Sequence, residues 1–289
     1  MSVKSIGLGF YHLIYRSLSG LGLYRLKWVK KVNKHLIVAL RRQQVVVNGL
    51  TLHLDRKDSL NLSVFPDYEP VETAYIKKTV RPGFVAVDIG ANIGYYTTLL
   101  AKQVGEAGRV YAFEPDKENF ATLKKNIEAN GLKNVVAENL AVSDRAKVVS
   151  LYYSGDKGDQ RTYDSKDGRE FVRISATSMD EYFRNMQSRV DFIKMDIQGS
   201  EGEALLGMRE LLKVNRDLIL NIEFWPFGLE KSGFGVKRIF DVLKDLDLSY
   251  SDMNREQDPV PTPEQMMSLY PASTKAFTNL ICIYRGQKR

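Results

Sequence analysis

Short apolar runs alternate with amphipathic segments along most of the chain. Apolar runs bounded by turn-forming residues predict strands, and apolar residues spaced three or four apart predict helices. This alternation is typical of an α/β fold with a mostly parallel sheet and helices on both faces. Strands are predicted at residues 84–88, 109–114, 134–139, 148–153, 171–175, 190–196, 218–223 and 277–284, with a loop or short strand at 249–251. Helices are predicted at residues 70–80, 95–104, 117–130, 180–186 and 236–246, with another just after residue 203.

The N-terminal residues follow a different pattern. Residues 1–42 combine apolar positions at helical spacing with Lys and Arg on the other faces, which predicts amphipathic helices. The longest uncharged run there, Ser5–Tyr15, is far shorter than the ~18 residues that a membrane-spanning helix needs. Residues 43–54 alternate around Asn48-Gly49, a dipeptide that favours a type I′ hairpin. Residues 1–64 are therefore expected to form a basic helical arm and a β-hairpin extension, without a signal peptide.

Charge is distributed unevenly along the chain. The net charge is +7, yet residues 1–48 contain nine Lys and Arg and no acid, which leaves 33 basic and 35 acidic residues in the remainder. The main domain thus carries a slight negative charge. A nucleic-acid enzyme more often carries positive charge around its active site, so we do not expect a nucleic-acid substrate.

Cysteine and histidine are scarce. The single cysteine, Cys282, cannot form a disulfide within the chain, and it favours a reducing, cytoplasmic location. A catalytic Ser-His-Asp or Cys-His arrangement within the main domain is not expected, because all three histidines precede it: His12, His35 and His53.

The most informative stretch is Phe84–Tyr96. An apolar run ends at Asp88, a turn containing Gly90, Asn92 and Gly94 follows, and a helix begins. Glycines let a backbone approach a ligand closely, and a helix start offers free N–H groups. The spacing differs from the Gly-x-Gly-x-x-Gly fingerprint that holds a dinucleotide pyrophosphate. Because an acid at the strand end would repel a pyrophosphate, a cationic ligand such as S-adenosylmethionine fits better.

Further acids end other predicted strands. Glu114 stands about 20 residues after Gly94, where an acid in a Rossmann-like sheet accepts hydrogen bonds from ribose hydroxyls. Ligands of such sheets bind at the carboxyl ends of the strands. The acids predicted at these ends are Asp88, Glu114, Asp196 and Glu223. Together they suggest a site for a cationic cofactor, a hydroxyl-rich substrate or a divalent metal.

A helix is predicted to begin beside Glu69-Pro70, since proline suits an early helical position. Acids in the first turn can simply complement the helix dipole. The alternative is that Glu69 or Glu72 faces the cofactor, and we assign Glu69 to cofactor binding.

Four segments resemble the FkbM-type methyltransferases. The similarity extends over about residues 65–285, and the segments that carry it are Val-Asp-Ile-Gly-Ala-Asn-Ile-Gly-Tyr-Tyr (87–96), Phe-Glu-Pro (113–115), Asn-Leu-Ala-Val-Ser-Asp (139–144) and Lys-Met-Asp-Ile-Gln-Gly-Ser-Glu (194–201). The resemblance implies a class I S-adenosylmethionine-dependent methyltransferase domain over 65–289. Its sheet would have seven strands, all parallel except the one at 277–284. The family is associated with O-methylation of hydroxyls on sugars and polyketide-like products.

The resemblance also implies roles for individual residues. Glu114 would hold the ribose hydroxyls, and Asn139 and Ala141 would flank the adenine. Asp196 would lie beside the transferred methyl group. The methionine and ribose parts of the cofactor would be cradled by Asp88, Gly90, Asn92 and Gly94.

The catalytic base is predicted among the acids near Asp196. An alcohol acceptor must lose a proton during methyl transfer, and a positioned carboxylate can accept it. Asp196 is the first candidate and Glu201 the second, because this chain has Gln198 where family members often have Glu. A divalent metal held by Asp196 and a second acid is an alternative that we do not favour.

The acceptor is left open by the sequence. A glycan, a glycolipid and a small natural product all fit, and the polar loop at 154–169 is expected to select the substrate or to begin a hairpin insertion. Two other functions are alternatives: a nicotinamide-dependent oxidoreductase, and a non-catalytic module that binds S-adenosylmethionine.

The basic arm gives the first testable prediction. The plain interpretation is a helical extension with its basic face in water, and the alternative is peripheral contact with anionic lipid. A chain lacking residues 1–42 should co-sediment less with anionic liposomes than the full chain if the arm binds lipid. Unchanged sedimentation would exclude membrane contact through this arm.

Overall fold

The computed structural model describes residues 36, 38–66, 68–154, 158–186, 189–255 and 260–286. The chain divides into two compact units, residues 1–68 and 69–289. Most of the predicted helical arm lies outside the described residues. The division into an extension (1–64) and a catalytic domain (65–289) stays a prediction, because compactness alone does not tell which residues catalysis needs.

The first unit contains the predicted hairpin. β1 (Gln44–Val47) pairs with β2 (Leu50–His53) in antiparallel register. Asn48 and Gly49 have φ values of 55° and 72°, and two positive values are what a type I′ turn requires. The Asn-Gly prediction is confirmed.

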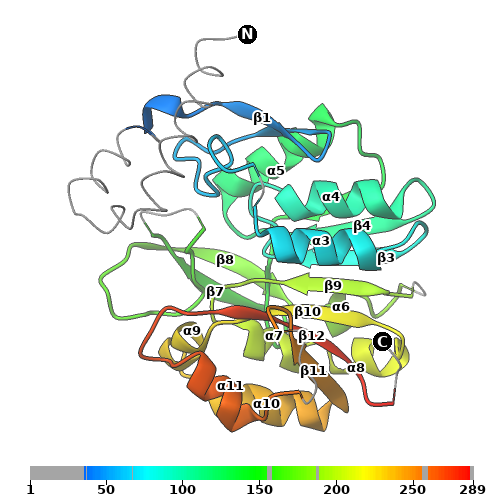
Figure 1. The fold of residues 1–289 in the computed structure, drawn as a ribbon, viewed down its shortest axis with the longest axis vertical. Coiled ribbons are helices and arrows are strands. Elements are labelled where there is room, and N and C mark those ends of the chain that lie inside the picture. Colours follow the sequence, from blue (N-terminus) through cyan, green and yellow to red (C-terminus); the bar gives the residue numbers. More distant parts are fainter. Residues whose placement is uncertain are drawn as a thin grey trace. The chain divides into compact units, whose positions relative to one another are not determined.

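A seven-stranded sheet forms the centre of the second unit (Figure 1). Its strand order is β11-β12-β10-β9-β3-β4-β5. All neighbouring strands are parallel except that β12 runs antiparallel to β10 and β11. The predicted sheet, with one antiparallel strand, is confirmed. Its strands are β3 (Val85–Ile89), β4 (Arg109–Phe113), β5 (Val135–Glu138), β9 (Phe192–Met195), β10 (Ile219–Phe224), β11 (Leu248–Asp252) and β12 (Thr278–Tyr284).

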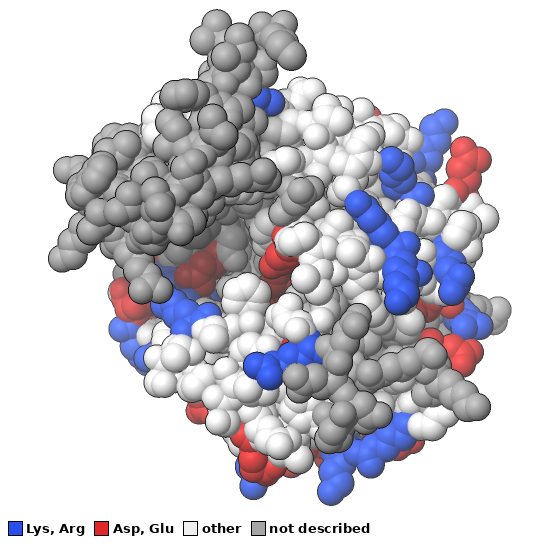
Figure 2. Space-filling model, in the orientation of Figure 1, with Lys and Arg blue, Asp and Glu red and all other residues white. Residues whose placement is uncertain are grey.

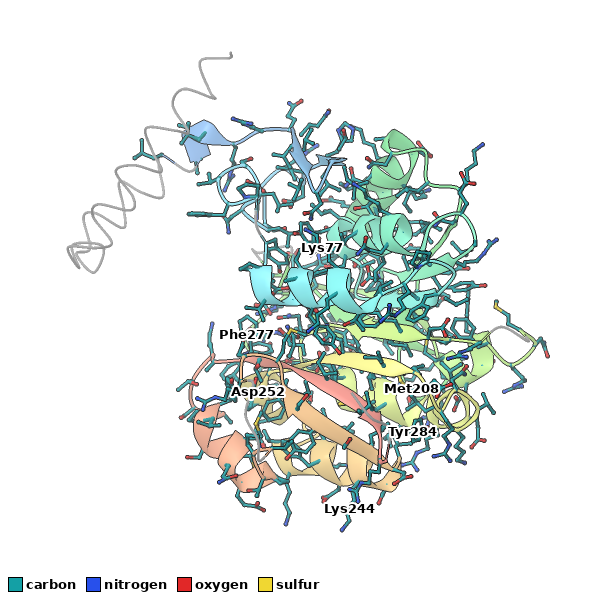
Figure 3. The ribbon with its side chains drawn as sticks, turned by 45° about the vertical axis from the view of Figure 1, so that its right-hand side comes forward. Lys77, Met208, Lys244, Asp252, Phe277 and Tyr284 are labelled. Atoms are coloured by element: carbon teal, nitrogen blue, oxygen red, sulfur yellow. The ribbon has the colours of Figure 1, made fainter. Side chains whose placement is uncertain are left out.

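Helices cover both faces of this sheet, as predicted (Figure 1). One layer consists of α3 (Pro70–Thr79), α4 (Tyr95–Val104) and α5 (Lys117–Ala129). The opposite side carries α6 (Met179–Tyr182), α7 (Glu201–Leu206), α8 (Arg209–Val214), α9 (Pro226–Lys231), α10 (Val236–Asp245) and α11 (Pro263–Leu269). Figure 3 labels Lys77 on α3 and Lys244 on α10, one from each layer.

The two faces of the central strands differ in chemistry. Val87, Ile193 and Ile222 belong to the large apolar core shared with the α7 and α10 layer. The alternate positions point the other way, toward α3 and α4, and three of them in the middle of the sheet are polar. There the strand register aligns Asp88 with Lys194, and Lys194 with Asn221. We call Asp88, Lys194 and Asn221 the polar row. All three side chains are buried.

Several elements differ from the predictions. The helix expected after residue 203 is two short helices, α7 and α8, divided at Gly207. A Cβ on Gly207 would lie 2.2 Å from the backbone oxygen of Ser143, so only glycine fits this contact. The strands predicted at 148–153 and 171–175 are present as β7 (Lys147–Tyr152) and β8 (Phe171–Thr177), but they form an antiparallel hairpin outside the main sheet, joined by β6 (Ala141–Val142). The predictions missed β6, α9 and α11.

Gly90 and Gly131 offer a matched test of why glycine is needed in the loop after β3. Both have positive φ, 86° and 61°, but a Cβ on Gly90 would lie 1.9 Å from the backbone oxygen of Asp196, and one on Gly131 would meet nothing within 4 Å. Gly90→Ala should therefore lower the free energy of unfolding by about 2–4 kcal/mol, and Gly131→Ala by only about 1 kcal/mol. Urea denaturation of both variants measures this. Equal losses would show that the contact with Asp196 does not matter.

Candidate active site

The glycine-rich turn joins β3 to α4 at the carboxyl edge of the sheet. The N–H groups of Gly90 and Ala91 both donate to the carbonyl of Phe113 at 3.0 Å, which ties the turn to β4. Gly90, Asn92 and Gly94 all have positive φ. Because Gly90 has no side chain, the backbone of Asp196 can lie against it, and the turn is in direct contact with the end of β9.

Glu114 is fixed beside this turn. One carboxylate oxygen accepts from the N–H of Asn92 at 2.7 Å, and the other accepts from the N–H of Asp116 at 2.9 Å. Burial raises the pKa of Glu114 to about 8, although these two N–H groups oppose the shift. The Asn119 side chain is a third hydrogen-bond donor to Glu114. A carboxylate has about four acceptor positions, so one remains for a ribose hydroxyl.

Asn139 and Ala141 follow β5. The amide of Asn139 donates to the carbonyls of Glu114 and Pro115 at 2.8 and 3.0 Å, and so holds the segment that carries Glu114. Ala141 lies in β6, buried and paired with Ala176 of β8. The contacts of both residues are structural, and their predicted place beside the adenine stays a prediction.

Asp88 and Lys194 form the centre of the polar row. One oxygen of Asp88 accepts from the hydroxyl of Thr97 at 2.6 Å, and the other has no partner among the described residues. Burial raises the pKa of Asp88, and the nearby charge of Lys194 opposes the shift. The Lys194 ammonium lies 3.5 Å from Asp196 and 4.6 Å from the ring centre of Tyr96.

Lys194 is almost wholly buried, with 3% of its side chain exposed. Burial disfavours its charge, but the surrounding acids outweigh burial and raise its pKa. These acids, in order of effect, are Asp196, Glu72, Asp88 and Glu69. One buried cation therefore balances acids from α3, β3 and the end of β9.

Two acids of α3 meet at one tyrosine. The hydroxyl of Tyr96 lies 2.8 Å from Glu69 and 3.0 Å from Glu72. Glu72 is buried and also accepts amide hydrogens of Asn221 at 2.6 Å and Asn279 at 3.2 Å. These bonds fasten α3 to α4 and to the sheet, and they hold Glu69 at the carboxyl edge.

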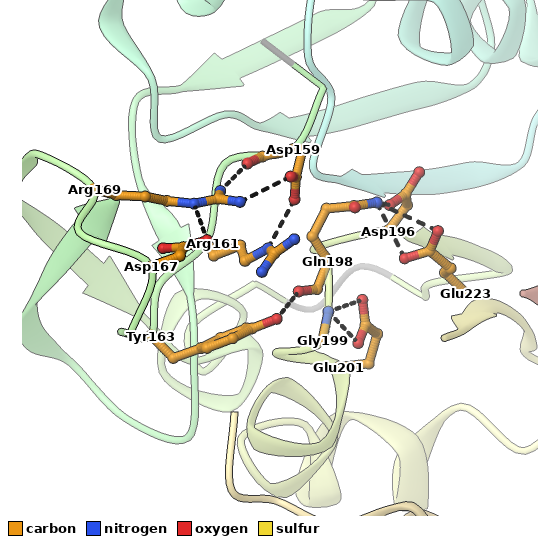
Figure 4. A network of polar contacts seen from close by, with 10 residues as sticks. All are labelled: Asp159, Arg161, Tyr163, Asp167, Arg169, Asp196, Gln198, Gly199, Glu201 and Glu223. Atoms are coloured by element: carbon orange, nitrogen blue, oxygen red, sulfur yellow. Dashed lines mark hydrogen bonds and ion pairs between the residues drawn. The ribbon is translucent and has the colours of Figure 1, made fainter. Parts of the chain in front are cut away.

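Asp196 and Glu223 are bridged by one side chain. The amide of Gln198 donates to Asp196 at 2.8 Å and lies 3.1 and 3.3 Å from the two oxygens of Glu223 (Figure 4). Burial raises the pKa of Glu223 well above its ordinary value, and the neighbouring charges of Asp196 and Glu201 add to the shift. Asp196 is the more accessible carboxylate, with 25% of its side chain exposed.

Glu201 shapes the turn that carries Gln198. Its carboxylate is fully buried and accepts from the N–H groups of Ile197 at 3.0 Å and Gly199 at 2.9 Å. Burial raises its pKa to about 7, and these backbone N–H groups oppose the shift. Gln198 has a φ of 56°, a conformation that the closed turn imposes.

The loop between β7 and β8 is fastened to the same turn (Figure 4). The hydroxyl of Tyr163 donates to the carbonyl of Gln198 at 2.9 Å, and the hydroxyls of Thr162 and Ser200 lie 2.6 Å apart. Arg161 is buried, pairs with Asp159 at 2.7 Å and stacks 5.0 Å from the ring centre of Trp225. The predicted substrate-selecting loop is thus anchored beside Asp196.

The structure brings the predicted site residues to one edge of the sheet. The sequence predictions assigned no role to Tyr96 or Lys194, and they named Glu72 only as an alternative to Glu69. One signal in the sequence could have indicated these roles, namely a lysine inside an otherwise apolar strand. A buried charge needs partners, so such a lysine predicts acids close to it in the fold.

Two features are absent from the residues that the structure describes. No group of three or more His, Cys, Asp or Glu side chains has an arrangement that could hold a metal ion. No described helix combines the length and the apolar character needed to cross a membrane.

Residues 88–250 match the methyltransferase FkbM domain family, and this span is more than half of the 289 residues. The chain belongs to this family. The match begins at Asp88 and includes the glycine-rich turn, Glu114 and the Gln198 turn. Membership in a methyltransferase family removes the support for a nicotinamide-dependent oxidoreductase.

Curated relatives of this FkbM methyltransferase are distant. The 2-O-methyltransferase NoeI of Sinorhizobium fredii is 23% identical over 185 residues, which are 58% of this chain and 74% of NoeI. Methyltransferase sdnD of Sordaria araneosa is 26% identical over 53% of this chain and 74% of its own length. Protein-L-isoaspartate O-methyltransferase of Aeropyrum pernix is 39% identical, but the match spans only 23% of this chain and 25% of that protein.

Solved structures give the same general likeness. Precorrin-6y C5,15-methyltransferase from Geobacter metallireducens has a TM-score of 0.43 at 12% identity, with 74% of this chain and 87% of that chain covered. An rRNA methylase from Streptococcus thermophilus has a TM-score of 0.41 at 11% identity, with coverage of 76% and 96%.

The raised pKa of Glu114 predicts how stability depends on pH. Unfolded, Glu114 ionises near its ordinary pKa of 4.5, whereas folded it ionises near 8. Between these values the folded state holds the extra proton, so the free energy of unfolding falls as pH rises, by about 1.4 kcal/mol per pH unit for one such proton. Glu69 and Glu201 act in the same direction, since the pKa of each is also raised.

Denaturation of the ligand-free protein from pH 5 to pH 8 tests this dependence. Glu114→Gln should flatten the decline, because glutamine does not titrate, while Glu128→Gln, an exposed position on α5, should not. Equal slopes for the wild type and Glu114→Gln would contradict the assignment.

Proposed function

We propose that this protein uses S-adenosylmethionine to methylate a hydroxyl group of a sugar, glycolipid or natural product. One observation carries the proposal. A Cβ on Gly90 would lie 1.9 Å from the backbone oxygen of Asp196, so the glycine-rich turn and the end of β9 are in direct contact. A methyl donor held by the turn therefore has an ionisable carboxylate beside it.

The residues at the turn fit this cofactor. Asp88 offers a carboxylate beside the turn, and burial leaves one of its oxygens without a partner among the described residues. Glu114 keeps an acceptor position for a ribose hydroxyl, and Glu69 adds an acid at the same edge. When bound, S-adenosylmethionine supplies a methyl group already activated by its sulfonium. Gly90, Asn92 and Gly94 complete the proposed cofactor site, with Asn139 and Ala141 at its adenine end.

Asp196 is the proposed general base. Its carboxylate takes the proton of the acceptor hydroxyl while the oxygen attacks, which is typically worth 10²–10⁴-fold in rate. Lys194 and Gln198 hold Asp196 from two sides, at 3.5 and 2.8 Å, and so fix its direction. Alignment of the acceptor oxygen with the methyl group supplies the rest of the acceleration.

Glu201 is the second candidate base, but we assign it a positioning role. Its oxygens are used by the N–H groups of Ile197 and Gly199, which form the turn that presents Gln198. A group engaged in this way is less able to accept a substrate proton. We propose no catalytic metal.

A hydroxyl-bearing small molecule or glycan is the proposed acceptor. The relative NoeI is named as a 2-O-methyltransferase, which supports oxygen as the methylated atom. On the face drawn in Figure 2, the described Lys and Arg side chains are interspersed with Asp and Glu, an arrangement that does not favour a nucleic-acid backbone. The single Cys282 supports a cytoplasmic location. Peripheral membrane contact through residues 1–42 stays a hypothesis, since most of that arm is outside the described residues.

Asp88 and Asp196 allow the two halves of the site to be tested separately. Asp196→Asn should lower kcat by about 10²-fold or more while the Kd for S-adenosylmethionine changes less than about twofold. Asp88→Ala should abolish cofactor binding. Calorimetry gives the Kd, and transfer of a labelled methyl group to cell-extract acceptors, followed by product identification, gives turnover and the acceptor.

Asp241→Asn, an exposed position on α10, is the matched control and should behave as the wild type. Normal turnover by Asp196→Asn would refute the assigned base. Cofactor binding without transfer to any acceptor by the wild type would favour a non-catalytic binding module.

A further inference from the structure

The hydroxyl of Tyr96 contacts two carboxylates, Glu69 and Glu72, and has only one proton to donate. The Tyr96 hydroxyl lies 2.8 Å from an oxygen of Glu69 and 3.0 Å from an oxygen of Glu72. A tyrosine hydroxyl carries one proton, so it donates to only one of these oxygens. If both carboxylates were ionised, the other contact would join two electron-rich oxygens without a proton between them.

The other partners of these acids indicate which one holds the additional proton. Glu72 accepts amide hydrogens from Asn221 and Asn279, which favours its ionised form. Glu69 has fewer donors: it begins α3 but makes no side-chain cap with the helix N–H groups. Burial and the charge of Glu72 raise the pKa of Glu69 to about 8.

The backbone of Glu69 shows that its position is imposed. Its φ of 41° and ψ of 67° are left-handed, which is unfavourable for a residue with a long side chain. Strain of this kind persists where surrounding contacts hold a residue in place, and it is concentrated at functional sites. Glu69 is half-buried and so the more accessible of the two acids, whereas Glu72 is buried.

The titratable groups around Glu69 come from four elements. Glu72 belongs to α3, Tyr96 to α4, and Glu223 to β10. Lys194 of β9 and Asp196 just beyond it have opposite effects: Lys194 favours an ionised Glu69 and Asp196 disfavours it. Three acids and only one cation therefore surround Glu69. While no ligand is bound, an additional proton on the cluster reduces its net negative charge.

We propose that Glu69 and Glu72 share one proton through Tyr96 in the free protein, and that Glu69 releases it when it receives the ammonium group of the methionine part of the cofactor. The inference rests on the proposed function. No covalent bond changes: the proton passes from the Glu69 carboxyl to the buffer, and the ammonium takes its place as the neutralising charge. Tyr96 and Glu72 thereby become positioning residues for cofactor binding.

Calorimetric titration with S-adenosylmethionine at pH 6.5 tests this proposal. At this pH the amine of the free cofactor is already charged, since α-amino groups have a pKa of about 7.7–8.0. Titrations in two buffers of different ionisation enthalpy should report release of about one proton per cofactor bound. The analogue 5′-methylthioadenosine, which lacks the amino acid part, should bind without releasing a proton.

Variants of Glu69 and Glu72 test which residue holds the proton that is released on cofactor binding. Glu69→Gln should remove proton release and weaken the Kd for S-adenosylmethionine at least about tenfold, with little effect on 5′-methylthioadenosine. Glu72→Gln should reduce proton release while binding persists, because Glu69 then ionises without the added negative charge of Glu72. Glu128→Gln, exposed on α5, should match the wild type. Circular dichroism establishes that each variant is folded.

The outcomes separate two failures. Wild-type protein that binds neither ligand would overturn the proposed function itself. Wild-type protein that binds S-adenosylmethionine with no dependence of the heat on the buffer would overturn the shared proton and leave the proposed function intact. The wild-type measurements decide both points even if a variant fails to fold.

Discussion

The buried ammonium of Lys194 is the interaction on which the site depends. It stands in the middle of the polar row and balances acids contributed by α3, β3 and the end of β9. A buried charge without partners costs several kcal/mol, and the same holds for each buried acid around it. Lys194 and the buried acids around it therefore each need the other's charge to stay buried. A cationic ligand can enter this cluster because acids outnumber the single lysine.

A second constraint comes from backbone contact between the two halves of the site. Gly90 lies against the carbonyl of Asp196, and Gly199 lies against the backbone of Gly228. Each contact excludes a side chain, so the glycines are needed for packing within the protein. This changes the meaning of the glycine-rich turn. Gly90 first allows the loops after β3 and β9 to lie against each other, and the proposed ligand site lies at that contact.

Gln198 acquires a role that a glutamate could not fill in the same way. Its amide donates to Asp196 and Glu223, whereas a third carboxylate at this position would repel both. Tyr163 holds the carbonyl of the same residue, which links the loop between β7 and β8 to the proposed base. The side chains that orient Asp196 and the loop that can contact the acceptor are therefore parts of one hydrogen-bonded unit.

The sequence by itself determined the fold class, the hairpin and the acids at the strand ends. These follow from local signals: apolar runs, turn residues and the fixed direction of parallel strands, which brings Asp88 and Asp196 to one edge. The seven strands of the sheet were implied by the resemblance to the FkbM-type methyltransferases. It could not place Lys194 against Asp196, set Tyr96 between Glu69 and Glu72, or divide the helix at Gly207. Those contacts join residues distant in the chain or depend on packing between separate elements. Only the tertiary structure decided them, because the charge state and direction of a buried group are set by neighbours that local sequence does not name.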